Sequence, residues 1–389
     1  MNMDSKPDYL GIYLRELQGD FYGPDYYRHP QSEIDSAIIY DDGEDKRTVS
    51  ALLVTSLAPR RALEVGCATG LLVKAMRGYG VEAEGFDFSR WCIEHADPQA
   101  RRWVRWGDLL EPPGEGGAYD LVLALDVLEH LPPEKVSLAL SNLAAALAGG
   151  GLLFAVIPAY GPNRFGPELF PLRYEGWRRD AALGVPFRDL PLDDRGRPHL
   201  GHLTHATIDW WEQALRRCGL RRLGRVERLL HVRYDAALEP ARRSFFLFVK
   251  SGPLGCWQAQ RRLIRRIAAV PGLPRGFWSW ECWDQCRWMR WTDGAAWEPV
   301  ELSGRRAVEV EALCNHPGIA AEPVEVTFQF DGEGPQRYEL RDHDWHQVKL
   351  AAPRRRFAGL GVTSSRTWVP DPEAPRGSRR RLGVGLSYR

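Results

Sequence analysis

Eight consecutive residues, Leu63-Glu64-Val65-Gly66-Cys67-Ala68-Thr69-Gly70, decide the fold of this 389-residue chain. An apolar, strand-forming segment leads into a turn of small residues, and helical spacing follows over residues 71–79. Gly66 allows a tight turn, and the small residues Ala68 and Gly70 let a ligand lie close to the backbone. A strand, a turn of this kind and a helix, in this order, predict an α/β sheet that binds a ligand at the turn.

The turn is poorly suited to a phosphate group. A dinucleotide-binding turn spaces its glycines as G-x-G-x-x-G, so that a pyrophosphate can sit at the N-terminus of the next helix. That spacing is absent here, and Glu64 stands directly before the turn, where its charge would repel a phosphate. Glu64 suits an ammonium group instead, directly or through water. S-adenosylmethionine carries such a group and no phosphate.

The alternation of strands and helices continues from residue 61 to residue 157. We expect strands at residues 62–65, 83–86, 103–106, 121–125 and 152–157. The segments between them with helical spacing are 71–79, 90–96 and 134–147. Apolar strands separated by helices are typical of a parallel sheet that is covered on both faces. A helix over 208–218 and two last strands, at 222–229 and 244–250, would complete a Rossmann-like sheet of seven strands.

Three further acids follow strands of this sheet. Asp87 ends the second strand, Asp108 follows the third, and Asp126 follows the fourth. These acids should lie near the turn, because open α/β sheets bind ligands at the carboxyl ends of their strands. Asp87 can accept hydrogen bonds from both ribose hydroxyls, and Asp108 can accept one from an adenine amino group while the Leu109 backbone reads the ring edge. A single Asp after a strand is usually a helix cap, but the acids in register predict an adenosine site.

These residues resemble the motifs of the class I S-adenosylmethionine-dependent methyltransferases. Glu64-x-Gly66-x-Ala68-x-Gly70 is similar to the E-x-G-x-G-x-G motif of that family, with alanine at the middle glycine. Residues 120–132, which contain Asp-Val-Leu-Glu-His-Leu-Pro, resemble its segment after the fourth strand. The resemblance covers about residues 45–250 and implies S-adenosylmethionine as cofactor and methyl transfer as reaction. The predicted cofactor contacts are Glu64, Gly66, Cys67, Gly70, Asp87, Phe88, Asp108, Leu109, Leu125 and Asp126.

Histidines are the candidates for the catalytic base. An acceptor hydroxyl must lose its proton during methyl transfer, and histidine is the usual base near neutral pH. His202 and His205 precede the helix expected at 208–218, in a segment that resembles the lead-in to the last helix of many small-molecule methyltransferases. We favour His202, then His205, while a role in capping the helix or holding a lid remains open. His130, after the fourth strand, is a second candidate, although this position in the family more often shapes the pocket.

Residues 158–206 interrupt the sheet pattern with a segment rich in Pro, Gly and Arg. A long excursion here is typical of an acceptor-side insert. A polar groove with aromatic walls in this insert would favour a sugar acceptor, and a closed apolar pocket would favour a phenol. The adjacent acids Asp193 and Asp194 lie in this segment, where such residues usually form turns. We therefore expect no metal ion.

The rest of the chain predicts a second domain. We expect a methyltransferase domain over 1–252, a connector helix and linker over 253–277, and a β-sandwich over 278–389. In the last part, apolar residues alternate with period two in short segments at 307–313, 324–330, 337–340, 347–350 and 359–364. This part resembles a β-sandwich module of bacterial glycosyltransferases and methyltransferases of surface-polysaccharide assembly, which implies a glycan setting. Its tryptophans can stack on sugars, but filling the core is their commoner use.

The composition of the chain limits its expected partners and cellular location. A formal net charge of +1 gives no electrostatic case for nucleic acid. No apolar run is long enough to span a bilayer, and the polar start lacks the apolar core of a signal peptide. Seven scattered cysteines predict reduced thiols in the cytoplasm. The basic amphipathic stretch 256–270 is expected to pack as a connector helix, with peripheral membrane association as the alternative.

Three functions therefore compete. The leading one is methyl transfer to a hydroxyl of a sugar, on a nucleotide sugar or a growing polysaccharide. The second is methyl transfer to a small phenol or quinone metabolite. The third is a non-catalytic glycan-binding scaffold whose cofactor fold is a relic. Against this function argue the intact turn at Glu64 and the acids Asp87 and Asp108.

Overall fold

The computed structural model describes Gly11, Tyr22 and residues 44–112, 116–194, 196–283, 287–370 and 380–388. Most of the first 43 residues of the domain predicted over 1–252 therefore lie outside the described residues, as does Cys286. The chain divides into two compact units. The first comprises Met1–Asp45, Pro59–Val73 and Val81–Ile264, and the second Lys46–Ala58, Lys74–Gly80 and Arg265–Arg389. No disulfide and no helix long and apolar enough to cross a membrane occur in the described part of the chain.

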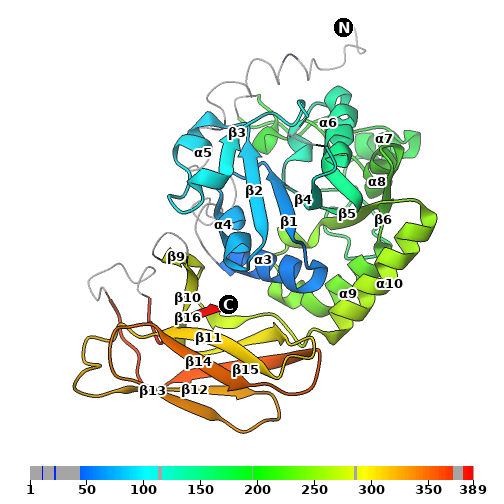
Figure 1. Ribbon diagram of the computed structural model, residues 1–389. Coiled ribbons are helices and arrows are strands. Elements are labelled where there is room, and N and C mark those ends of the chain that lie inside the picture. Colours follow the sequence, from blue (N-terminus) through cyan, green and yellow to red (C-terminus); the bar gives the residue numbers. More distant parts are fainter. Residues whose placement is uncertain are drawn as a thin grey trace. The chain divides into compact units, whose positions relative to one another are not determined.

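A seven-stranded sheet forms the centre of the first unit (Figure 1). Its strands are β1 (Arg61–Val65), β2 (Glu82–Asp87), β3 (Val104–Trp106), β4 (Tyr119–Leu125), β5 (Leu147–Val156), β6 (Leu220–Arg222) and β7 (Phe245–Lys250). The order is β3-β2-β1-β4-β5-β7-β6. β1 to β5 pair in parallel, whereas β7 runs antiparallel to both β5 and β6. The predicted Rossmann-like sheet of seven strands is confirmed. The strand order reverses between β1 and β4, the place where open α/β sheets bind ligands.

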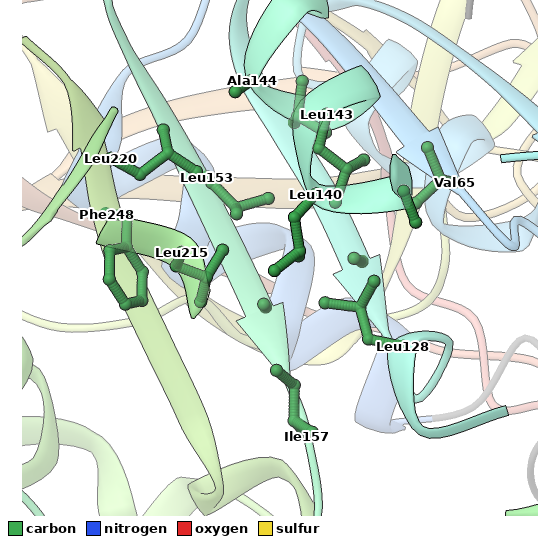
Figure 2. Packing of buried hydrophobic residues seen from close by; sticks show 14 of the residues in the cluster. Val65, Leu128, Leu140, Leu143, Ala144, Leu153, Ile157, Leu215, Leu220 and Phe248 are labelled. Atoms are coloured by element: carbon green, nitrogen blue, oxygen red, sulfur yellow. The ribbon is translucent and has the colours of Figure 1, made fainter. Parts of the chain in front are cut away.

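Helices flank the strands, and helices were predicted at the segments 71–79, 90–96, 134–147 and 208–218, where the structure has them. They are α3 (Glu44–Leu57), α4 (Leu71–Gly78), α5 (Arg90–Glu94), α6 (Pro133–Ala146), α7 (Glu175–Leu183), α8 (Ile208–Arg217), α9 (Gly224–Tyr234) and α10 (Pro253–Ala269). Figure 2 shows how α6 and α8 pack on one face of the sheet. Leu140 and Leu143 of α6 and Leu215 of α8 meet Leu153 of β5 and Phe248 of β7 in one buried cluster. Full burial of such a side chain contributes about 1.5–3 kcal/mol to stability. The cluster therefore fixes α6 and α8, which lie on either side of the insert 158–206 in the sequence.

The prediction of a strand over 222–229 is wrong. β6 ends at Arg222, and α9 begins at Gly224. Val226, Leu230 and Tyr234 are buried at intervals of four residues, which is the period of a helix and not of a strand. A short apolar segment of this kind is ambiguous between the two structures when only the sequence is considered. α9 lies against β7, where its His231 stacks on Phe245 with ring centroids 4.2 Å apart.

The second unit contains a nine-stranded antiparallel sheet. Its strands are β8 (Arg275–Phe277), β9 (Glu281–Trp283), β10 (Arg287–Glu301), β11 (Ala307–Leu313), β12 (Val324–Phe330), β13 (Gln336–Leu340), β14 (His346–Ala351), β15 (Phe357–Ser364) and β16 (Gly385–Tyr388). The main path is β13-β12-β15-β10-β16-β11-β14, and β8 and β9 both pair with β10. The segments with period two are strands, and β8, β9, β10 and β16 are strands that the pattern did not predict.

Most of the buried apolar residues of this sheet form one core cluster. Phe328, Val310 and Leu350 come from different strands and are fully buried together. The edge strands β13 and β14 are linked, because the Tyr338 hydroxyl donates to the Lys349 carbonyl at 3.0 Å. Four half-buried tryptophans, Trp278, Trp283, Trp345 and Trp368, pack around a second, smaller cluster. These tryptophans therefore contribute buried aromatic surface to the second unit.

Candidate functional site

The ends of four parallel strands meet at one edge of the first sheet. Val65, the last residue of β1, lies opposite Phe86 of β2 and Ala124 of β4. Asp87, the last residue of β2, lies opposite Trp106, the last of β3. The loops that follow these strands carry the predicted cofactor residues, so the topology brings residues 64–70, 87–88, 108–109 and 125–126 to the same edge.

The turn after β1 has an unusual backbone. Gly66, Ala68 and Gly70 all adopt positive φ angles, of 67°, 46° and 83°. A Cβ atom on Gly66 would lie 2.3 Å from Cγ2 of Val127, so this position accepts only glycine. Ala68 adopts the left-handed conformation although it is not glycine, at a cost of about 1–2 kcal/mol. The turn is thus held in a strained, closely packed form next to the loop after β4.

Asp87 fixes this turn. Its Oδ2 accepts a hydrogen bond from the backbone N–H of Ala68, and its Oδ1 accepts one from that of Ser89, both at 2.7 Å. The Asp87 carbonyl accepts from the N–H of Gly107 at 3.0 Å. Burial raises the pKa of Asp87, and the two backbone hydrogen bonds to its carboxylate oppose that rise. One residue therefore ties together the loops after β1, β2 and β3.

Negative charge gathers around the turn. Glu64 and Asp87 are both buried. Burial raises the pKa of the Cys67 thiol well above its ordinary value, and the charges of Glu64 and Asp87 raise it further. The turn is therefore unfavourable for an anion and favourable for a cationic group.

The predicted residues after β2 and β3 have local partners. The Phe88 carbonyl accepts the indole N–H of Trp106 at 2.9 Å. Asp108 accepts the backbone N–H of Leu110 on its Oδ1 at 2.9 Å, which forms a turn. The Leu109 side chain is buried in the core beside α6. At this edge the side chains of Phe88 and Asp108 are half-buried. The Leu109 side chain packs in the core, so Leu109 offers chiefly its backbone to a ligand.

The end of β4 is half-buried and charged. Leu125 is its last residue, and Asp126 follows with a positive φ of 54°. Asp126 forms an ion pair with Arg242, which also pairs with Asp45 at 3.1 Å. Burial lowers the pKa of Arg242, but the charges of Asp126 and Asp45 outweigh it and raise the pKa. Asp126 therefore already has a strong protein partner beside the predicted site.

The segments 128–131 and 202–205 are joined by backbone hydrogen bonds. The N–H groups of Leu203 and Thr204 both donate to the Glu129 carbonyl, at 2.8 and 2.9 Å. The Thr204 hydroxyl donates to the Leu131 carbonyl at 2.6 Å. These bonds hold His202 and His205, the predicted catalytic residues, beside the loop after β4.

Three histidines gather there. The rings of His130 and His202 meet edge to face with centroids 4.8 Å apart, and the rings of His202 and His205 lie 5.6 Å apart. Burial lowers the pKa of His130 and of His205 to about 4, and it lowers the pKa of His202 well below its ordinary value. The cluster is therefore neutral at pH 7 and carries free nitrogen lone pairs.

His205 lies in an aromatic enclosure. Its Nδ1 is 2.8 Å from the Tyr160 hydroxyl, and its buried Nε2 has no hydrogen-bond partner among the described residues. Trp177 stacks on the His205 ring at 5.7 Å and on Phe187 at 4.8 Å. The insert 158–206 supplies these aromatic residues, Tyr160, Trp177 and Phe187. Residues of the insert therefore form the aromatic surroundings of the predicted base.

Glu129 also belongs to this cluster, although it was not predicted as a site residue. Its side chain is 1% exposed, and neither carboxylate oxygen has a hydrogen-bond partner among the described residues. Its Oε1 lies 4.0 Å from Nε2 of His202. Burial raises the pKa of Glu129 well above its ordinary value, and the charge of Asp126 adds to the rise. The sequence carries one signal that could have predicted this site residue: Glu129 is an acid that stands, with His130, between the apolar residues Leu128 and Leu131.

Asp193 stabilises the loop in which it lies. Its Oδ1 accepts the backbone N–H of Arg197 at 2.9 Å, and its Oδ2 accepts from the Arg197 guanidinium at 2.9 Å. Asp194 is exposed. This pair of acids therefore lies in a turn that is closed by an arginine.

Known proteins are similar to part of this chain in sequence. Residues 41–223 match a family model described as "Methyltransferase domain". The ubiquinone biosynthesis O-methyltransferase of Methylococcus capsulatus is 29% identical over 159 residues, which cover 34% of this chain and 66% of that enzyme. The enzyme of the same name from Burkholderia vietnamiensis is 32% identical over 108 residues, 26% of this chain and 46% of that enzyme. The chain thus spans less than two thirds of the length of these curated relatives.

A solved structure is also similar. It is the 1,6-didemethyltoxoflavin-N1-methyltransferase of Burkholderia thailandensis with bound 1,6-didemethyltoxoflavin and S-adenosylhomocysteine. It is 16% identical, and the match covers 64% of this chain and 90% of that chain with a TM-score of 0.37. This likeness carries no argument, and the family match is the informative one: residues 41–223, just under half of the chain, are similar to the family described as a methyltransferase domain.

Proposed function

We propose that the protein transfers a methyl group from S-adenosylmethionine to a hydroxyl group of a small phenol or quinol. In this reaction the acceptor oxygen forms a bond to the methyl carbon while the bond from that carbon to sulfur breaks. The sulfur keeps the electron pair and becomes neutral, and the hydroxyl proton passes to a base. The protein must therefore align two ligands, exclude water and receive one proton.

The cofactor is assigned to the edge formed by the ends of β1 to β4. The negative charge of Glu64 and Asp87 suits a ligand with an ammonium and a sulfonium group and no phosphate. Asp87 can accept from the ribose hydroxyls with lone pairs that remain after its two backbone bonds. Asp108, Leu109, Phe88, Leu125 and Asp126 are the proposed remaining contacts, together with Gly66, Cys67 and Gly70.

The observation that supports an aromatic acceptor is the aromatic enclosure of His205. Trp177 and Phe187 stack together beside its ring, so a flat aromatic acceptor could extend the stack with its hydroxyl toward Nε2. A phenol also loses its proton readily, with a pKa of about 10 for a tyrosine side chain. The relatives that are named ubiquinone biosynthesis O-methyltransferases support an aromatic acceptor. We assign receipt of the proton to the His202–His205 pair.

A sugar acceptor, which the sequence favoured, is the second candidate. The resemblance of residues 278–389 to a polysaccharide-assembly module supports it. The half-buried Trp283 and Trp345 also leave part of their rings at the surface. This support concerns the second unit, whereas the aromatic wall stands beside the proposed base itself.

The test is a methyl-transfer assay with cofactor that carries a labelled methyl group. The protein is incubated with solvent-extracted small metabolites of its host, with simple catechols, and separately with polysaccharide and nucleotide-sugar fractions. Label in the aromatic small-molecule fraction supports the proposal. Label found only in the sugar fractions would replace the acceptor with a sugar, and no transfer to any fraction would contradict methyl transfer to a hydroxyl.

A further inference from the structure

The carboxylate of Glu129 takes no part in the methyl transfer proposed above. It is buried, and its oxygens have no hydrogen-bond partner within the described residues. A buried, unpaired charge is costly, and such groups are normally paired or coordinate metals. The carbonyl of the same residue accepts from two backbone N–H groups, which hold the backbone that carries this side chain in place.

Two imidazoles face this carboxylate. Glu129, His130 and His202 each offer one ligand atom, and these three atoms lie within 4.8 Å of one another. His130 and Glu129 are neighbours in the chain, whereas His202 comes from the insert segment 73 residues after Glu129 (202 minus 129). The backbone bonds from Leu203 and Thr204 to Glu129 bring the two segments together.

The orientation of His130 fits a metal ligand. Its Nδ1 lies 3.2 Å from the Gly201 carbonyl and 2.9 Å from the Tyr22 hydroxyl. A histidine that binds a metal through one nitrogen usually donates its other N–H to a backbone carbonyl or a carboxylate, which fixes the tautomer. In the tautomer with the proton on Nδ1, His130 donates to the Gly201 carbonyl, and Nε2 is then the nitrogen that can bind a metal.

We propose that Glu129, His130 and His202 bind one divalent transition-metal ion, most suitably zinc. Two imidazole nitrogens and one carboxylate are a donor set of catalytic zinc sites, which keep a fourth position open for water or substrate. Imidazole donors favour zinc and its transition-metal neighbours over magnesium and calcium, which prefer oxygen. Asp126 is not included, because Arg242 already pairs with it.

This inference rests on the proposed function and deepens it. A cation at the open position would stabilise negative charge on the acceptor oxygen as its proton leaves. The bonds change as described above: the oxygen lone pair forms the new bond to carbon, and the electron pair of the broken carbon–sulfur bond stays on sulfur. The roles of the two predicted bases then differ, with His202 as a ligand and His205 as the group that receives the proton. The inference departs from the expectation of no metal, which considered only Asp193 and Asp194.

The experiment measures metal binding without an acceptor. The protein is purified, its affinity tag is removed, and bound ions are stripped with a chelator. Zinc chloride is then titrated by calorimetry, and cobalt(II) is added in a parallel sample to record visible absorption. We expect one zinc per chain and cobalt bands characteristic of nitrogen and oxygen ligation in a four- or five-coordinate site.

Variants locate the site. Glu129→Gln and His202→Ala should each weaken zinc binding by at least about 100-fold, since loss of an outer-shell partner alone costs 10–100-fold. His205→Ala is the matched control, because it removes a neighbouring buried histidine outside the donor set, and it should keep wild-type zinc affinity. S-adenosylhomocysteine binding by each variant reports that the fold is retained.

Two results would overturn the site. One is a folded wild-type protein that binds S-adenosylhomocysteine but takes up no stoichiometric zinc, cobalt, manganese or nickel. The other is wild-type zinc affinity in Glu129→Gln. Either result leaves methyl transfer untouched, because the labelled-methyl assay tests that reaction by itself. Conversely, one bound zinc in a protein that transfers no methyl group would support the metal site and contradict only the proposed function.

Discussion

The backbone N–H of Ala68 donates a 2.7 Å hydrogen bond to Oδ2 of Asp87. This bond joins the turn after β1 to the acid at the end of β2, two parts of the proposed cofactor site that are 19 residues apart in the sequence. Asp87 thus has two roles in the proposal. It shapes the turn through its own hydrogen bonds and offers its remaining lone pairs to a ribose.

The first prediction concerns cofactor binding. S-adenosylhomocysteine should bind with micromolar-order affinity, about −8 kcal/mol, by calorimetry. Asp87→Ala should weaken this binding by at least about tenfold, since a hydrogen bond to a charged group contributes about 1.5–3 kcal/mol. Its far-UV circular dichroism should stay that of the wild type. Tight binding of NAD with none of S-adenosylhomocysteine would contradict the cofactor assignment.

The second prediction concerns the turn. Gly66→Ala should destabilise the protein by about 1–3 kcal/mol beyond the cost of its positive φ, because the new Cβ collides with Val127. Gly219→Ala is the matched control. Gly219 also has a positive φ, of 82°, but a Cβ there meets no atom within 4 Å, so it should lose only about 1–2 kcal/mol. Urea denaturation measures both changes, and equal losses would show that the contact with Val127 is relieved.

The third prediction concerns the proposed base. His205→Ala should lower kcat by about 100-fold, the lower end of a general-base contribution, with S-adenosylhomocysteine affinity unchanged. Tyr160→Phe removes the hydroxyl bonded to Nδ1 but keeps the ring, so its loss should be smaller. Steady-state kinetics with the true acceptor measures both. A full-rate His205→Ala enzyme would assign the residue to structure and return His202 to consideration as the base.

The fourth prediction concerns a buried ion pair. The Arg222 guanidinium donates to both carboxylate oxygens of Glu227, at 2.9–3.1 Å, and both side chains are buried. Arg222→Met leaves Glu227 as an unpaired buried acid, so it should lower the free energy of unfolding by about 3–5 kcal/mol. The exposed pair Arg355–Glu333 is the control, because Arg355→Met should cost at most about 1 kcal/mol. Similar losses in the two variants would contradict the burial argument.

The fifth prediction concerns acid stability. Burial raises the pKa of Glu212, but hydrogen bonds and charges from Arg222 and Arg164 outweigh it and hold the pKa below its ordinary value of 4.5. Since the folded pKa is the lower one, the stabilisation is present above pH 4.5 and is lost as the pH falls through the folded pKa. Glu212→Gln should therefore be less stable than the wild type at pH 6, and the gap should narrow below pH 4.5. Melting temperatures across pH 3–6 measure the gap, and a constant gap would contradict this assignment.

Much of the first unit follows from local sequence. The strands β1 to β5 and the turn at residues 66–70 are each encoded by contiguous residues, so alternation of apolar segments and the small-residue turn are enough to predict them. The acids that follow β2, β3 and β4 reach one edge because parallel strands share a direction. α9 was missed, because its apolar residues 226 and 230 fit either period over so short a window. β10 was missed because its tryptophans and charged residues do not alternate as in a half-buried strand.

By itself, then, the sequence determined the class of the sheet, the position of the turn and the sign of the charge that it favours. Only the tertiary structure decided that Glu129, His130 and His202 share one cluster, and that aromatic rings of Tyr160, Trp177 and Phe187 gather beside His205. The physical reason is the range of the interactions. A turn is closed by its own neighbours, whereas the cluster depends on two backbone hydrogen bonds that join segments more than seventy residues apart. No period in the sequence records such a contact, because its energy depends on burial that exists only after the chain has folded.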